Sequence, residues 1–329
     1  MLAKTYNIFR RLASFLKRIV RMLRYILREI CLAYKGNSII ASYLDIPAKK
    51  NQVNIYQYHP KRFGYDLYQN KPYNLGDSLG EVIVEYFLKQ KGIDINAKVS
   101  STKHLYCVGS NIQGGYQDAT IWGSGMFPFE TKALYQKGLN IPGFSHIIFL
   151  LQKISRRKLD IRAVRGPLTK KVLEDYGFKC PGVFGDPAIL MPLIYNPDVK
   201  KDKRRLIIPQ FVYERQFRTN HPNENIVSMN TNDYKSVIDE IVSSEIVYTS
   251  SLHGIILAES YGVPAVFFRC LPKFTDFKYL DYYYSTGRTN IKIAESFEEA
   301  LTMDPLPLPD LSGLRKGLLE SFPYDLWEK

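Results

Sequence analysis

Apolar and polar positions alternate with two different periods between residues 50 and 290. Short runs of consecutive or alternating apolar residues predict buried strands, and apolar residues three or four positions apart predict helices. Gly and Pro residues separate most of these segments. The expected strands are Val53–His59, Leu105–Val108, Ala119–Trp122, Ile161–Val164, Leu206–Pro209, Ile246–Thr249 and Ala265–Phe268. The expected helices are Leu79–Lys91, Pro167–Tyr176, Asp233–Ser244 and His253–Tyr261.

The alternation of strands and helices predicts an α/β fold with doubly wound parallel sheets. A polar segment rich in charge, residues 195–204, divides the pattern into two series and indicates a linker between domains. We therefore expect two Rossmann-like domains, residues 50–198 and 204–329, with a cleft between them. This is a GT-B-like arrangement, in which residues 296–329 would pack back as closing helices.

The first 36 residues carry a dense positive charge. They contain nine Lys or Arg residues and one acid, so they hold +8 of the net charge of +13. An apolar stripe over residues 5–34, with basic residues on the opposite side, predicts an amphipathic helix. The segment contains no uncharged run near the ~20 residues that span a bilayer, and it has no secretory signal layout. These properties favour a helix that lies on an anionic membrane surface. A helix docked on the core of the protein, or one that binds an acidic partner, would show the same pattern.

Composition excludes several classes of function. Hydrophobic residues make up 45% and charged residues 23% of the chain, as in a globular protein. The four Cys and five His residues show no spacing typical of a metal site, so we expect no metal and reduced thiols. No nucleic-acid-binding motif is present, and the charge outside the first 36 residues is modest. The 24 Tyr residues suit sugar stacking or core packing equally well.

The first candidate motif is Asn74-Leu75-Gly76-Asp77-Ser78-Leu79-Gly80, which opens a predicted helix. Its glycines permit close approach of a ligand to the backbone, and N–H groups at a helix start attract anions or hydroxyls. Asp77 could cap the helix or act as an acid or a base.

The second candidate motif is Val164-Arg165-Gly166-Pro167, followed by Gly185-Asp186-Pro187. Arg165 follows a predicted strand and precedes a helix, which is where ligands gather in open α/β sheets. A guanidinium binds a carboxylate or a phosphate through two parallel hydrogen bonds. The alternatives are a surface ion pair for Arg165 and a simple turn at Asp186.

The third candidate motif runs from Tyr248 through Ser250-Ser251-Leu252-His253-Gly254 into a predicted helix. Two hydroxyls, the N–H groups of the first helical turn and the helix dipole would together form an anion site. The imidazole of His253 exchanges protons near neutral pH, which suits proton transfer.

In this order and at these separations, the motifs resemble the polysaccharide pyruvyl transferase family, in its exopolysaccharide or capsule ketal-pyruvate branch. Further matching pieces are Ile121-Trp122-Gly123-Ser124-Gly125, Gly185-Asp186-Pro187-Ala188, the stretch from Ser251 to Pro264, Phe277-Lys278-Tyr279-Leu280-Asp281-Tyr282 and Ser285-Thr286-Gly287-Arg288. The resemblance implies transfer of a pyruvyl group from phosphoenolpyruvate to two hydroxyls of a glycan sugar, as a ketal, with no essential metal or other cofactor. It also implies that Arg165 and His253 serve the donor site.

One position departs from the family pattern, because some members carry an Arg where this chain has Ser251. A second cation for the donor must then come from elsewhere, and the candidates are Arg288, Lys278, Lys273 and Arg269. We take His253 first for proton transfer or phosphate binding, with Asp77 and Asp186 as candidate bases. The residues expected to bind substrate are Arg165, Ser250, Ser251, Leu252, Gly254, Asn74, Gly123, Ser124, Arg288 and Lys278.

The resemblance also suggests a setting for the reaction. Pyruvylated bacterial glycans are commonly built on lipid-linked intermediates, so we expect the protein in the cytoplasm, attached peripherally to the inner face of the cell membrane. The acceptor would lie on residues 50–198 and the donor on 204–329. Two rival functions remain: a GT-B glycosyltransferase that uses a nucleotide sugar, and a non-catalytic, membrane-attached component of a capsule assembly complex.

Overall fold

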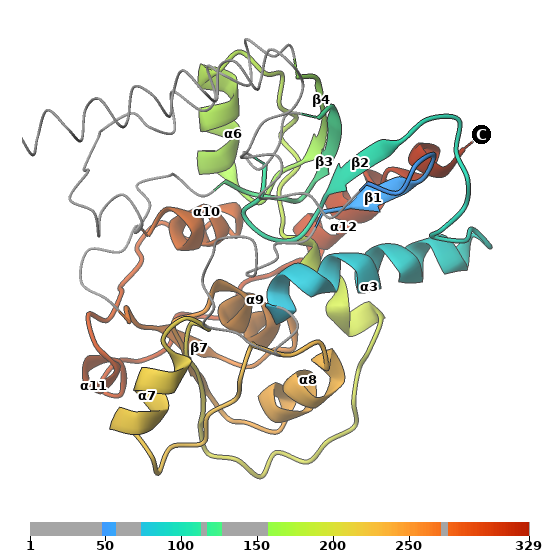
Figure 1. Cartoon of the computed structure of the whole chain (residues 1–329). Helices are drawn as coiled ribbons and strands as arrows, with labels where there is room; N and C mark the ends of the chain where they lie inside the picture. Colours follow the sequence, from blue (N-terminus) through green and yellow to red (C-terminus); the bar gives the residue numbers. More distant parts are fainter. Residues whose placement is uncertain (1–47, 57–73, 113–116, 127–156, 271–275, 329) are drawn as a thin grey trace, which may run out of the picture.

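The computed structural model describes residues 48–56, 74–112, 117–126, 157–270 and 276–328 (Figure 1). The basic segment 1–36 lies outside these ranges, so its expected amphipathic helix stays a prediction. Lys273 also lies outside them. Within the described ranges, no helix has both the length and the apolar character that crossing a membrane requires.

The first sheet has four parallel strands in chain order: β1 (Val53–Ile55), β2 (Lys103–Tyr106), β3 (Ala119–Trp122) and β4 (Leu159–Ala163). Helix α3 (Leu75–Gln90) lies between β1 and β2 in the chain and buries one apolar face that includes Leu75, Leu79 and Ile83. Helix α6 (Pro167–Asp175) follows β4 and begins with a proline, which a first helical turn tolerates.

The second sheet has three parallel strands, β5 (Leu206–Ile208), β6 (Val247–Thr249) and β7 (Ala265–Phe267), and every residue in them is buried. Between β5 and β6 lie α7 (Glu214–Asn220) and α8 (Tyr234–Val242). Helix α9 (Leu252–Ser260) connects β6 to β7, and all nine of its residues are buried. A mostly apolar helix that is buried on every side belongs in the interior of a protein. The expected α/β fold with parallel sheets is therefore confirmed.

The two sheets share one hydrophobic core. A single apolar cluster includes Val53 and Leu79 of the first half and Leu206 and Ile255 of the second. A 3-10 helix, η3 (Pro187–Leu193), packs against both α3 and α9. The expected linker, residues 195–204, forms no helix and no strand of either sheet.

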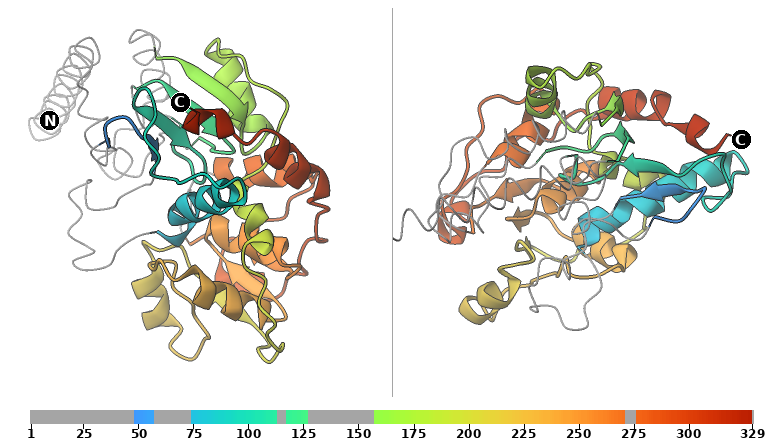
Figure 2. Two further views of the ribbon diagram at one scale, coloured as in Figure 1. Left: turned by 90° about the vertical axis from the view of Figure 1, so that its right-hand side faces the viewer. Right: turned by 45° about the horizontal axis from the view of Figure 1, so that its top comes forward.

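After β7 the chain forms α10 (Phe277–Ser285), α11 (Phe297–Ala300), α12 (Ser312–Glu320) and η4 (Tyr324–Trp327). Helix α12 and η4 return to the first sheet, where they lie beside β1 and β2 (Figures 1 and 2). The indole N–H of Trp122 donates to the Leu318 carbonyl at 3.0 Å, and that of Trp327 donates to the Ile95 carbonyl at 3.1 Å. The last helices thus complete the cover of the first sheet.

Candidate functional site

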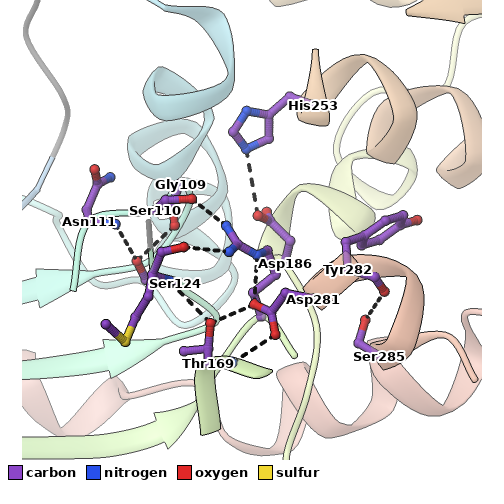
Figure 3. A network of polar contacts seen from close by, with 12 residues as sticks. Gly109, Ser110, Asn111, Ser124, Thr169, Asp186, His253, Asp281, Tyr282 and Ser285 are labelled. Carbon is purple, nitrogen blue, oxygen red and sulfur yellow. Dashed lines mark hydrogen bonds and ion pairs between the residues drawn. The ribbon is translucent and has the colours of Figure 1, made fainter. Parts of the chain in front are cut away.

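The three sequence motifs meet where the strands of both sheets end. Asn74 begins α3, Arg165 follows β4, and Ser251 begins α9 after β6. Side chains from both halves of the chain lie together there in one polar cluster (Figure 3). We call the three residues His253, Asp186 and Asp77 the central cluster.

His253 occupies the first turn of α9 and is 6% exposed. Its ring lies directly on Gly76 in the first turn of α3. A Cβ atom at position 76 would stand 1.8 Å from Nδ1 of His253, which is far inside van der Waals contact. Glycine is therefore required at position 76 for the imidazole to occupy its place.

His253 and Asp186 form an incomplete pair in the interior. Nε2 of His253 lies 3.7 Å from Oδ2 of Asp186 (Figure 3). Both atoms are buried, and neither has a hydrogen-bond partner. The other oxygen of Asp186, Oδ1, accepts the Ala188 N–H at 3.1 Å and caps η3. Burial of polar atoms without partners is costly, and in native proteins it marks strain, catalysis or a bound ligand.

Asp77 is the third acidic or basic group of the central cluster and is 7% exposed. It does not cap α3. That role belongs to Asn74, whose Oδ1 accepts the Gly76 N–H, while its Nδ2 donates to Oδ2 of Asp77 at 3.1 Å. Burial raises the pKa of Asp77 to about 6, although the charges of His253 and Lys278 and a hydrogen bond from Asn111 oppose the rise. A carboxyl with this pKa changes its protonation state close to neutral pH, as acid–base catalysis requires.

The start of α9 retains part of the expected anion site. Ser251 is the N-cap residue, but its hydroxyl makes no capping hydrogen bond, so the N–H groups of the first turn keep their capacity to bind an anion. Ser250 is different, because its hydroxyl accepts the Gln210 N–H at 2.8 Å. Leu252 packs in the core, and Gly254 lies against the Thr249 hydroxyl. Of the two serines, Ser251 is the one whose hydroxyl does not cap the helix, whereas that of Ser250 is occupied by Gln210.

Arg165 is fully buried in a polar network that joins the two halves. Figure 3 labels Ser110, Thr169 and Asp281 of this network. Its Nε donates to Oδ2 of Asp281 at 3.0 Å, and its two terminal nitrogens donate to the Ser110 hydroxyl and the Met126 carbonyl. The sequence suggests a surface ion pair as the alternative to donor binding. The pair that forms is an interior one.

Gly123 and Ser124 shape the loop after β3. Gly123 has a φ of +83°, and a side chain there would collide with the ring of Pro187. The buried hydroxyl of Ser124 donates to the Gly109 carbonyl at 3.0 Å. Both residues support the loops around the central cluster through contacts within the protein.

The candidates for a second donor cation differ in their surroundings. Lys278, in the first turn of α10, interacts electrostatically with Asp77 and Arg165, and burial together with the Arg165 charge lowers its pKa to about 8. Arg288 is bound on both terminal nitrogens by Glu259, near the far end of α9 from His253. Arg269 forms ion pairs with Asp276 and Glu295. Among the described candidates, Lys278 is the one that lies beside the central cluster.

The structure also adds residues that the motifs did not single out. Asn111 binds Asp77, Ser110 binds Arg165, and Asp281 pairs with Arg165. The only sequence signal for Asp281 is its place in the family-like string Phe277–Tyr282. Within the described ranges, no group of three or more His, Cys, Asp or Glu residues could hold a metal ion.

One comparison with known proteins, that with family models, agrees with the motif analysis. A model of the polysaccharide pyruvyl transferase family matches residues 74–271, which contain Asn74, Asp77, Arg165, Asp186 and His253. The curated proteins yield no match. Among solved structures, a functionally uncharacterized protein from Klebsiella pneumoniae is 12% identical, with a TM-score of 0.40, over 71% of this chain and 87% of that one. The family match covers most of the chain and indicates a transferase of polysaccharide biosynthesis with a glycan acceptor. The chain belongs to the polysaccharide pyruvyl transferase family.

Proposed function

We propose that the protein transfers the pyruvyl group of phosphoenolpyruvate to two hydroxyls of one glycan sugar and forms a cyclic ketal. The observation that carries the proposal is the buried pair of His253 and Asp186, whose facing atoms lack partners 3.7 Å apart at the start of α9. Such a pair can accept and release a proton during a reaction. A GT-B-like division of labour, with the donor held by the second half and the acceptor by the first, fits this position.

The donor is a compact trianion at neutral pH, so its site needs cations and N–H donors. The uncapped first turn of α9 supplies N–H groups and the positive end of a helix dipole, and Ser251 adds a hydroxyl. Lys278 supplies a positive charge beside Asp77. We assign the phosphate to the start of α9 and the carboxylate to the side of Lys278 and Arg165.

The chemistry needs one proton delivered and two removed. Protonation of the methylene carbon of phosphoenolpyruvate leaves an oxocarbenium-like centre at C2. One sugar hydroxyl adds to C2 and loses its proton. The C2–O bond to phosphate then breaks, and the neighbouring hydroxyl closes the ketal and loses the second proton. One proton ends on the new methyl group and the other on inorganic phosphate, so the reaction is balanced.

We assign these proton transfers to the residues of the central cluster. His253 delivers or accepts a proton at Nε2, and Asp186 stabilises the imidazolium that forms when Nε2 is protonated. Asp77, with a pKa of about 6, is the second group that can exchange a proton. Two groups in different environments suit the two opposite tasks of an acid and a base.

The test is incubation of the purified protein with phosphoenolpyruvate and a panel of synthetic or lipid-linked glycosides. We expect phosphate release that depends on the acceptor, and a product that carries the pyruvyl mass increment. His253→Ala should fold normally and lose both, and near-normal phosphate release by this variant would refute the role of His253. Nucleotide sugars serve as the comparison, because stabilisation by UDP-sugars and not by phosphoenolpyruvate would instead support a glycosyltransferase.

We also propose where the reaction takes place and what it needs. The +8 charge of residues 1–36 would hold the enzyme on the anionic inner face of the cell membrane, where lipid-linked glycans are assembled. The reaction would need no metal or other cofactor, so a chelator should leave the rate unchanged. Deletion of residues 1–36 should weaken binding to anionic liposomes and spare activity on a soluble acceptor. Equal liposome binding by both forms would contradict the membrane proposal.

A further inference from the structure

The buried ion pair between Arg165 and Asp281 connects the two halves of the protein beside the central cluster. Arg165 follows β4 in the first half and Asp281 lies in α10 of the second half, 116 residues later. Both side chains are 0% exposed. Removing two charges from water is costly, and a well-packed apolar pair of the same size is often as stable. Stability alone therefore gives little reason for this ion pair.

Asp281 uses both of its oxygens to organise the neighbouring segment of the first half. Oδ1 accepts the Thr169 N–H at 2.9 Å, and Oδ2 accepts the Thr169 hydroxyl at 2.6 Å in addition to Nε of Arg165. The N-cap residue of α6, Gly166, has no side chain to cap that helix. Asp281, which belongs to α10, therefore caps the start of α6 in place of an N-cap side chain. This contact fixes α10 against the start of α6.

The packing around the pair leaves the guanidinium little freedom. A Cβ atom at Gly125 would lie 2.2 Å from Cζ of Arg165, and one at Gly166 would lie 1.9 Å from the Asp281 carbonyl. Nη1 of Arg165 donates to the Ser110 hydroxyl and Nη2 to the Met126 carbonyl. Each terminal nitrogen carries two hydrogens, so each keeps one N–H beyond these contacts.

Helix α10 brings a second cation to the same place. Lys278 lies three residues before Asp281, so the two side chains share one face of the helix. The charge of Lys278 interacts with both Arg165 and Asp77. Two cations this close repel each other, and the negative charge of Asp281 compensates that repulsion.

We propose that Asp281 is a positioning residue for the donor site: it holds the Arg165 guanidinium and the Lys278 ammonium in one fixed geometry that matches the phosphoenolpyruvate anion. This inference rests on the proposed function. Asp281 itself touches no substrate. It acts through Nε of Arg165 and through the placement of α10.

The test measures kcat and KM for phosphoenolpyruvate separately, together with thermal unfolding, in Asp281→Asn. Asparagine keeps the shape of the side chain but lacks the charge and one acceptor oxygen. We expect KM to rise about tenfold, as for loss of one charge-assisted interaction, with kcat per folded molecule changed by no more than about twofold.

Glu259→Gln is the matched control, because it breaks another buried ion pair, Glu259 with Arg288, away from Arg165. It should lower thermal stability by a similar amount and leave KM unchanged. An unchanged KM in Asp281→Asn would overturn the inference while leaving the proposed function intact. If wild-type protein neither binds phosphoenolpyruvate nor releases phosphate from it, the proposed function fails, and the inference fails with it.

A second variant covers the case in which Asp281→Asn does not fold. Ser110→Ala removes the hydroxyl that holds Nη1 of Arg165 and leaves both charges in place, at a partly exposed position. We expect KM for phosphoenolpyruvate to rise severalfold with kcat maintained. An unchanged KM would show that the position of the guanidinium has no influence on the donor, which overturns the inference.

Discussion

Replacement of Asp77 by Asn should make the protein more stable at neutral pH and inactive. Asp77 is 7% exposed, and burial raises its pKa from 3.8 to about 6. One pKa unit corresponds to about 1.4 kcal/mol. The ionised carboxylate therefore costs the folded state about 3 kcal/mol relative to the unfolded chain. Asn cannot ionise, but it has one acceptor oxygen fewer for the amides of Asn74 and Asn111, a loss of about 1 kcal/mol. The net gain is about 2 kcal/mol.

The pH dependence of this gain follows from the direction of the pKa shift. The folded protein holds the proton of Asp77 more tightly than the unfolded chain does, so stability falls as pH rises from about 4 to about 6. Above this window the full cost of the charge is present in the wild-type protein and absent in the variant. The variant should therefore exceed the wild type at about pH 7.5, whereas below about pH 4 only the lost acceptor remains and the variant should be about 1 kcal/mol less stable.

The assay is urea-induced unfolding of both proteins at several pH values, beside the transfer reaction. Glu85→Gln on the same helix is the control, since Glu85 is partly exposed and forms a surface ion pair with Lys89. A variant that is no more stable at neutral pH would refute the reasoning. So would a gain of equal size at low pH, because its origin could not be the ionisation of Asp77.

Three further changes test other parts of the structure. Gly76→Ala should lower kcat by at least about tenfold, because the added Cβ would stand 1.8 Å from Nδ1 of His253; unchanged turnover would show that the imidazole position is unimportant. Asp186→Asn should lower kcat with little effect on KM for phosphoenolpyruvate, since Oδ2 faces Nε2 of His253 and has no other partner; a rise in KM alone would instead assign Asp186 to binding. Arg288→Met should leave Glu259 as a buried charge without its cation, held by the Tyr282 hydroxyl, and destabilise the fold by about 3 kcal/mol, measured by urea unfolding, while KM stays constant.

Local sequence pattern was sufficient for most of the fold. The predicted strand–helix–strand series from Ile246 to Phe268 agrees within one residue at every end with β6, α9 and β7. Helix α3 begins four residues earlier than the periodicity predicted, at Leu75, because Asn74 caps it. Apolar periodicity reports which face is buried, whereas a cap depends on one side chain.

The pairing of charges could not be predicted in the same way. The residues around Arg165 in the sequence give no sign of its ion-pair partner, because that partner, Asp281, is 116 residues away. Arg288 was expected near the donor on resemblance alone, yet its guanidinium is bound by Glu259 and by the Thr286 hydroxyl. Which carboxylate meets which guanidinium is decided by the packing of α9 and α10, and no local spacing records that packing.

The return of α12 and η4 to the first sheet has a consequence for the synthesis of the chain. Trp122 is fully buried, and its indole N–H is bound by a carbonyl that leaves the ribosome 196 residues later. Phe322 completes the same apolar contact by packing on Trp122 and Phe87. During translation the apolar surface around Trp122 and Phe87 therefore stays uncovered until the second sheet and α12 have been synthesised. Such long-range closure slows folding and exposes apolar surface to aggregation and chaperones. A chain interrupted before Leu318 would consequently keep this apolar surface of the first sheet exposed.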